Sequence, residues 1–148
     1  MPFQPTQPST WNVVIADDEP DSVGIVEYVL RFHKACVRTA NSGQACIALL
    51  TKEMPDLLIL DVQMPQMSGW DVVKHIRNEP KMKDLVVIAM TAHAMYGDRE
   101  RILSAGFNLY LPKPLSPMTL IGDITNVLVI AETQRLSRHP EGSHAPPT

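Results

Sequence analysis

Side chains that could do chemistry stand at the ends of four apolar stretches of this sequence. Two acids follow residues 11–16, one acid follows residues 57–60, a hydroxyl follows residues 85–90, and an amine comes shortly after residues 109–111: Asp17 and Asp18, Asp61, Thr91, and Lys113. Short apolar runs bounded by polar and turn residues are typical of strands buried on both faces. Because open α/β sheets place their ligand sites at the carboxyl ends of such strands, we expect these side chains to meet at one edge of a sheet.

The assortment of these groups favours phosphoryl chemistry with a metal ion. The carboxylates of Asp18 and Asp61, with Asp17 behind them, would form a set of hard oxygen ligands, and Mg²⁺ prefers a few carboxylates together with waters and phosphate oxygens. A carboxylate can also attack phosphorus and form an aspartyl phosphate. The transition state spreads negative charge over the phosphoryl oxygens and needs a metal, a cation and a donor around it. Mg²⁺, Lys113 and Thr91 would supply these three.

Each of these residues also has an ordinary structural explanation. The acids at 17–19, which precede Pro20, would favour the positive end of a following helix. However, three adjacent carboxylates repel one another unless a cation is present. Thr91 alone could cap a helix, and Lys113 alone could be a solvated lysine. Their convergence on one expected edge favours the chemical interpretation.

The elements that would position these residues alternate regularly along the chain. Strands are expected over residues 11–16, 35–39, 57–60, 85–90 and 109–111, and helices over 21–32, 44–52, 70–78, 97–105 and 117–136. Strands that alternate with helices of roughly ten residues specify a parallel sheet. The expected fold is therefore α/β, a five-stranded parallel sheet in the flavodoxin-like order 2-1-3-4-5 with helices on both faces.

One domain accounts for most of the chain. Its 148 residues suit a single core, and one series of strands and helices uses residues 11–136. Residues 1–10 hold three prolines and no charged side chain, so we expect a disordered lead-in there. Residues 137–148 also hold three prolines and have little to bury, so we expect a disordered tail.

Charge and hydropathy exclude several partners. A formal net charge of -3 gives no basic footprint for nucleic acid or an anionic membrane. No apolar run approaches the roughly 18 residues of a membrane span, and the amino terminus lacks the basic start and apolar core of a signal peptide. The two cysteines, Cys36 and Cys46, fall in separate expected elements and would be reduced thiols. We therefore expect a cytoplasmic protein with no direct nucleic-acid or membrane partner.

The motifs resemble the receiver domain of two-component response regulators over about residues 11–132. They are Asp17-Asp18 after the first strand, Asp61 followed by Met64-Pro65 and Gly69, Thr91-Ala92 after the fourth strand, and Tyr110 with Lys113-Pro114. Each motif alone is weak, but their order and their places on the elements are specific. The chain is similar to the stand-alone, single-domain type, such as the chemotaxis response regulator.

The resemblance implies a phosphorylation and metal site. Asp61 would accept a phosphoryl group from a phosphohistidine of a sensor histidine kinase or a phosphotransfer protein. Asp18, Asp61 and the backbone carbonyl of Gln63 would bind Mg²⁺, and Asp17 would hold a metal-bound water. Gln63 and His93 occupy the two variable positions that tend to set how fast the aspartyl phosphate hydrolyses.

The resemblance also implies a switch. Lys113 would contact a phosphoryl oxygen, and the bond before Pro114 is usually cis in this family. Thr91 would swing to hydrogen-bond the phosphoryl group. Tyr110 would then rotate inward and change the face formed by the fourth helix, the fifth strand and the fifth helix.

No output domain is expected, because the tail is too short for a DNA-binding unit. Phosphorylation would therefore change the affinity for a downstream protein target. The protein would be a phosphoacceptor and not an enzyme, with slow autodephosphorylation at most. The last helix is apolar over more than one narrow stripe, which leaves room for a homodimer or partner face.

Three other interpretations stay open at this point. A phosphatase of the haloacid-dehalogenase type also uses a strand-end Asp and Mg²⁺, but it needs a second acid two residues beyond the nucleophile, where this chain has Gln63. A flavodoxin-like ligand binder would need a phosphate-cradling loop, and this edge is acidic instead. The chain could also be a receiver cut from a larger hybrid kinase or regulator.

Overall fold

The computed structural model describes residues 2–92 and 98–138. His93 and residues 139–148 of the expected tail lie outside the described residues. Strands and helices alternate along the described chain after a short 3₁₀ helix: η1 Pro8–Thr10, β1 Asn12–Ala16, α1 Pro20–Phe32, β2 Cys36–Ala40, α2 Gly43–Lys52, β3 Leu57–Asp61, α3 Gly69–Asn78, β4 Val86–Thr91, α4 Asp98–Ala105, β5 Leu109–Pro112 and α5 Pro117–Arg138.

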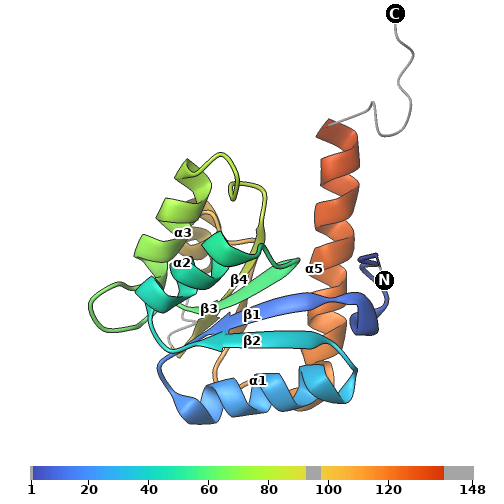
Figure 1. The fold of residues 1–148 in the computed structure, drawn as a ribbon, viewed down its shortest axis with the longest axis horizontal. Helices are drawn as coiled ribbons and strands as arrows, with labels where there is room; N and C mark the ends of the chain where they lie inside the picture. Colours follow the sequence, from blue (N-terminus) through green and yellow to red (C-terminus); the bar gives the residue numbers. More distant parts are fainter. Residues whose placement is uncertain (1, 93–97, 139–148) are drawn as a thin grey trace, which may run out of the picture.

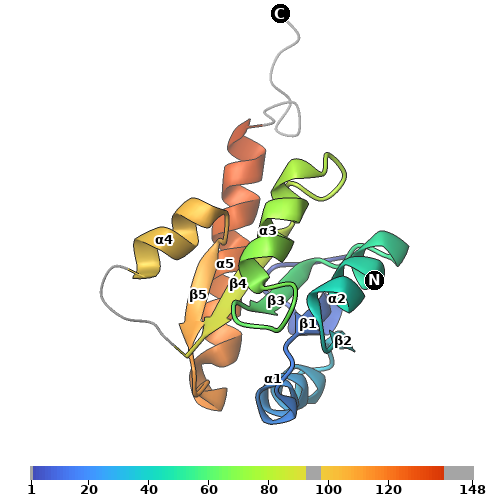
Figure 2. The same cartoon turned by 90° about the vertical axis from the view of Figure 1, so that its left-hand side faces the viewer.

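The strands form one parallel sheet in the order β2-β1-β3-β4-β5, which confirms the predicted fold. Helices α1 and α5 pack on one face of the sheet, and α2, α3 and α4 pack on the other (Figures 1 and 2). The strand order reverses direction between β1 and β3, where α/β sheets of this kind open a crevice at their carboxyl edge. This topology gathers the ends of β1, β3, β4 and β5 at one place.

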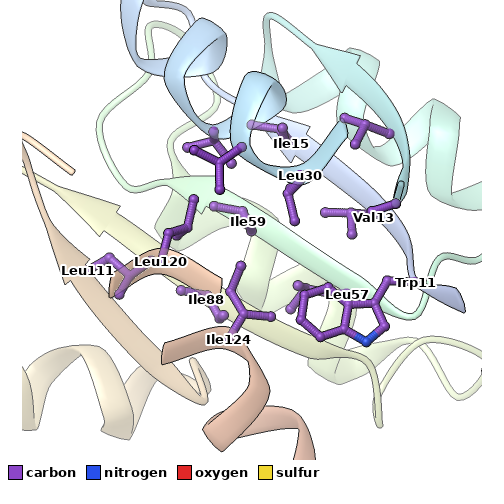
Figure 3. Close-up of a cluster of buried hydrophobic side chains, with 14 of the residues drawn as sticks. Trp11, Val13, Ile15, Leu30, Leu57, Ile59, Ile88, Leu111, Leu120 and Ile124 are labelled. Carbon is purple, nitrogen blue, oxygen red and sulfur yellow. The ribbon is translucent and has the colours of Figure 1, made fainter. Parts of the chain in front are cut away.

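Strand β3 lies in the middle of the sheet and is buried along its whole length. Its side chains alternate between the two cores, because successive residues of a strand point to opposite faces. Leu57 and Ile59 join the core under α1 and α5, which Figure 3 shows together with Trp11 and Ile124. Leu58 joins the core under α2, α3 and α4. A strand fixed on both faces holds its last residue, Asp61, in a firm position.

A close backbone approach shapes the loop after β3. A Cβ added at Gly69 would lie 2.3 Å from the carbonyl oxygen of Asp61 and 2.6 Å from the Cα of Val62. Only glycine fits there, since no Cβ is found so close to backbone atoms. Ser68 begins α3 by a capping box with Asp71. The loop is thereby held against the strand end that carries Asp61.

The amino-terminal segment differs from the expected disordered lead-in. The backbone N–H of Gln4 donates to Thr10 Oγ1 at 2.8 Å, and the Trp11 indole Nε1–H donates to the backbone carbonyl oxygen of Gln4 at 3.0 Å. Phe3 packs against the core under α1 and α5. Because the indole of Trp11 is buried, its N–H needs a partner, and the folded segment supplies it.

Helix α5 also differs slightly from expectation, because it continues two residues beyond position 136, to Arg138. It rises past the edge of the sheet in Figure 1. Within residues 2–92 and 98–138, no helix is both long and apolar enough to cross a membrane.

Candidate functional site

The carboxyl edge of the sheet brings together side chains from four strands. Asp17 follows β1, Asp61 ends β3, Thr91 ends β4, and Lys113 follows β5. Asp17, Asp61 and Thr91 are the buried polar side chains at this edge. Polar groups are buried at a cost unless they have partners, so their clustering here indicates a site.

Lys113 links the acids of this edge. Its Nζ lies 2.7 Å from Glu19 Oε1, 3.1 Å from Asp17 Oδ2 and 3.4 Å from Asp61 Oδ2. Its backbone N–H donates to the Thr91 carbonyl oxygen at 2.8 Å, which extends the pairing of β5 with β4. The bond between Lys113 and the following proline is cis. Burial alone would lower the pKa of Lys113, but its carboxylate partners raise it, so the amine stays charged.

Asp61 is buried and carries a perturbed carboxyl group. The pKa of Asp61 is raised from 3.8 to about 6, mainly by burial and also by the neighbouring charge of Asp17. The N–H of Gln63, which donates to Asp61 Oδ1 at 3.2 Å, and the charge of Lys113 act in the opposite direction. The ionised form of Asp61 is therefore poorly stabilised by the protein's own groups.

Asp17 offers an oxygen that is poorly satisfied. Its Oδ1 accepts the N–H of Glu19 at 2.9 Å. Its Oδ2 is buried and accepts no hydrogen bond from the described residues, although it lies within ion-pair distance of Lys113. Oxygens of Asp17, Glu19 and Asp61 lie within 4.8 Å of one another. A hard divalent cation such as Mg²⁺ fits this set of oxygen donors and the unsatisfied buried oxygen.

The arrangement of the consecutive acids differs from expectation at Asp18. Among the described residues, Asp18 is not part of the carboxylate cluster and is exposed, whereas Glu19 is part of it. The backbone of Asp17 still pairs with Ala40 of β2 at 3.1 Å, so adjacent side chains point to opposite sides. Asp18 lines a hollow together with Asp17 and Thr39. Sequence reasoning placed Glu19 among the acids at a helix start but not in the metal site, although its place as the third acid after β1 was a signal.

The comparisons with known proteins agree with this geometry. A sequence model of the response regulator receiver domain matches residues 13–125. The chain belongs to this receiver family. The polar-differentiation response regulator DivK of Brucella anthropi is 38% identical over 92 residues, which cover 62% of this chain and 74% of DivK. An uncharacterized 14.6 kDa protein in the sodA1 3′ region of Leptolyngbya boryana is 38% identical over 110 residues, which cover 74% of this chain and 84% of that protein.

Solved structures of receiver proteins share the fold. The chemotaxis response regulator CheY4 of Vibrio cholerae superposes with a TM-score of 0.73 at 28% identity, over 78% of this chain and 96% of CheY4. The N-terminal domain of a response regulator receiver protein from Methanoculleus marisnigri superposes with a TM-score of 0.66 at 28% identity, over 80% of this chain and 96% of that one. These matches bear out the predicted family and fold.

The remaining predicted residues lie around the receiver site as follows. Thr91 is buried at the end of β4, next to the strand that ends in Asp61. Tyr110 is half-buried on β5, where it packs against the core under α2, α3 and α4. It also lines a groove of about 520 Å³ with Leu103 of α4 and Asp123 of α5. Gln63 is exposed, and its backbone N–H donates to Asp61 Oδ1.

Proposed function

We propose that this receiver domain is a phosphoacceptor switch of a two-component system. Asp61 takes a phosphoryl group from a phosphohistidine of a sensor histidine kinase or a phosphotransfer protein. The protein then changes its affinity for a downstream protein target. In this proposal it is a phosphoacceptor and not an enzyme with many turnovers, and it acts in the cytoplasm.

The observation that carries the proposal is the meeting of Asp61 with Lys113 and Asp17. The three side chains come from the ends of three different strands, and Lys113 Nζ lies within 3.4 Å of both carboxylates. A buried carboxylate whose pKa is raised to about 6 is poorly stabilised when ionised. A cation beside it would relieve this cost.

The chain's own residues would divide the reaction among them. Asp61 would attack the phosphorus with a carboxylate oxygen. Lys113 would hold a phosphoryl oxygen by a charge-assisted hydrogen bond, and Thr91 would donate its hydroxyl to another. Both act where charge develops in the transition state.

The metal site would use the same cluster. Asp17 and Asp61, with the backbone carbonyl of Gln63, would hold Mg²⁺, and Asp18 would join them after turning inward from its exposed position. Bound Mg²⁺ would neutralise charge on the phosphoryl oxygens. The buried Oδ2 of Asp17, which accepts no hydrogen bond from the described residues, supports this assignment.

Thr91 and Tyr110 would transmit the conformational change from Asp61 to the surface that binds a partner. A phosphoryl group on Asp61 would draw the Thr91 hydroxyl toward it, and Tyr110 would follow inward. Tyr110 lines the groove between α4 and α5, so this movement would reshape the α4–β5–α5 face. That face would bind the downstream target or a second copy of the receiver domain.

Incubation with acetyl phosphate, with and without Mg²⁺, tests the proposal. We expect a phosphate mass adduct on the wild-type protein that requires Mg²⁺ and that Asp61→Asn lacks. Hydrolysis of many phosphate esters with steady turnover would instead support a phosphatase. The absence of any adduct at saturating Mg²⁺ would refute the proposal.

A further inference from the structure

Lys113 makes its shortest contact with an acid that lies outside the predicted site. The 2.7 Å distance to Glu19 Oε1 is typical of a strong charge-assisted hydrogen bond. The 3.4 Å distance to Asp61 Oδ2 exceeds the usual range for such a bond. The ammonium is therefore directed toward Glu19 more than toward Asp61, the residue that it must assist.

Glu19 is placed so that this contact can open. Its side chain is 62% exposed, whereas those of Lys113 and Asp61 are 11% and 5% exposed. Glu19 stands at the N-cap position of α1 but makes no side-chain capping hydrogen bond. Its carboxylate can therefore leave Lys113 for water without breaking a helix cap, and an ion pair with one exposed partner costs less to break than a fully buried one.

Three carboxylates face one ammonium in this cluster, so negative charge is in excess. An arriving phosphoryl donor is also an anion. It needs the ammonium that Glu19, the exposed member of the cluster, holds. Glu19 and the phosphoryl oxygens therefore compete for the same cation.

We propose that Glu19 is a positioning residue that holds the Lys113 ammonium away from Asp61 until a phosphoryl group displaces it. This inference rests on the proposed phosphoacceptor function. With acetyl phosphate, a carboxylate oxygen of Asp61 forms a bond to phosphorus as the bond from phosphorus to the acetate oxygen breaks. The electron pair leaves with acetate, and no proton is transferred. Lys113 must leave Glu19 during this step, so Glu19 slows phosphorylation.

The test measures the second-order rate constant for phosphorylation by acetyl phosphate at saturating Mg²⁺. Because only the Glu19 end of this ion pair is exposed and water can replace it there, Glu19→Gln should raise this constant modestly, about two- to fivefold. Glu19→Asp should do the same, since a side chain shorter by one methylene keeps the charge but loses contact with Lys113. Glu27→Gln is the matched control, because it removes the same charge from an exposed ion pair with Arg31 on the same helix. It should leave the constant unchanged.

A double-mutant cycle separates positioning from a general effect on structure or charge. In a Lys113→Gln background, Glu19→Gln should give no further acceleration, because the contact is already gone. A constant for Glu19→Gln equal to or below that of the wild type would overturn the inference. So would a wild-type constant for Glu19→Asp, which would indicate charge repulsion alone. If the wild-type protein forms no adduct at Asp61, the phosphoacceptor function itself fails, which is a different result.

Discussion

The substitution Asp61→Asn should stabilise the metal-free protein at neutral and alkaline pH. Asp61 is buried, and its pKa in the folded protein rises from 3.8 to about 6, mainly because burial disfavours the charged form. Above pH 6, Asp61 is ionised in both the folded and the unfolded state, and the folded state bears the cost. A difference of this size corresponds to about 3 kcal/mol, so we expect Asp61→Asn to gain about 1–3 kcal/mol at pH 8.

The sign of the pH dependence follows from the same shift. As the pH falls from 7 toward 4, the folded protein protonates Asp61 before the unfolded chain does. The wild-type protein therefore gains stability from this group over that window, and the advantage of Asp61→Asn should fade toward pH 4.

Urea denaturation in the presence of EDTA measures this difference at pH 5 and pH 8, with the fluorescence of the two tryptophans, Trp11 and Trp70, as the signal. Asp123→Asn removes one carboxylate from α5, outside the cluster, and serves as the control. A loss of stability in Asp61→Asn at pH 8 would contradict the reasoning. So would a difference from the wild type that is the same at both pH values.

Three further predictions concern the loop, the metal and the amino-terminal segment. Gly69→Ala should cost about 1–3 kcal/mol or more in urea denaturation, because the new Cβ meets backbone at 2.3 Å, whereas Gly24→Ala has open space and should not destabilise. Mg²⁺ at about 100 times its dissociation constant should stabilise the wild type by about 2.7 kcal/mol in thermal unfolding, and Asp17→Asn should reduce this gain. Deletion of residues 1–9 should cost about 1–3 kcal/mol in urea denaturation, because the Trp11 indole N–H loses its partner; an unchanged midpoint would contradict the packing of this segment.

The fold could be predicted from the sequence because polar and turn residues mark where each apolar run begins and ends. The run at residues 57–60 is uniformly apolar, as a strand covered on both faces must be, and the structure buries all of it. The positions of Asp17, Asp61 and Lys113 at strand ends followed from the parallel topology alone. Their convergence therefore needed no knowledge of side-chain orientation.

The parts that sequence reasoning missed depend on orientation and on individual contacts. Whether Asp18 or Glu19 turns toward Lys113 depends on how the chain leaves β1, which residue types and spacing do not specify. The amino-terminal segment was misjudged from its prolines. Phe3 packs against the core, and the buried indole N–H of Trp11 and the hydroxyl of Thr10 bond to Gln4 in this segment.

Chemical mapping of the phosphorylated residue tests the central claim most directly. Borohydride converts an aspartyl phosphate to homoserine, so treatment after incubation with acetyl phosphate and Mg²⁺ marks the acceptor for peptide mass spectrometry. We predict homoserine at position 61 and an unmodified aspartate at positions 17 and 18. Homoserine at either of those positions instead, or at none of the three, would show that the buried carboxylate beside Lys113 is not the acceptor.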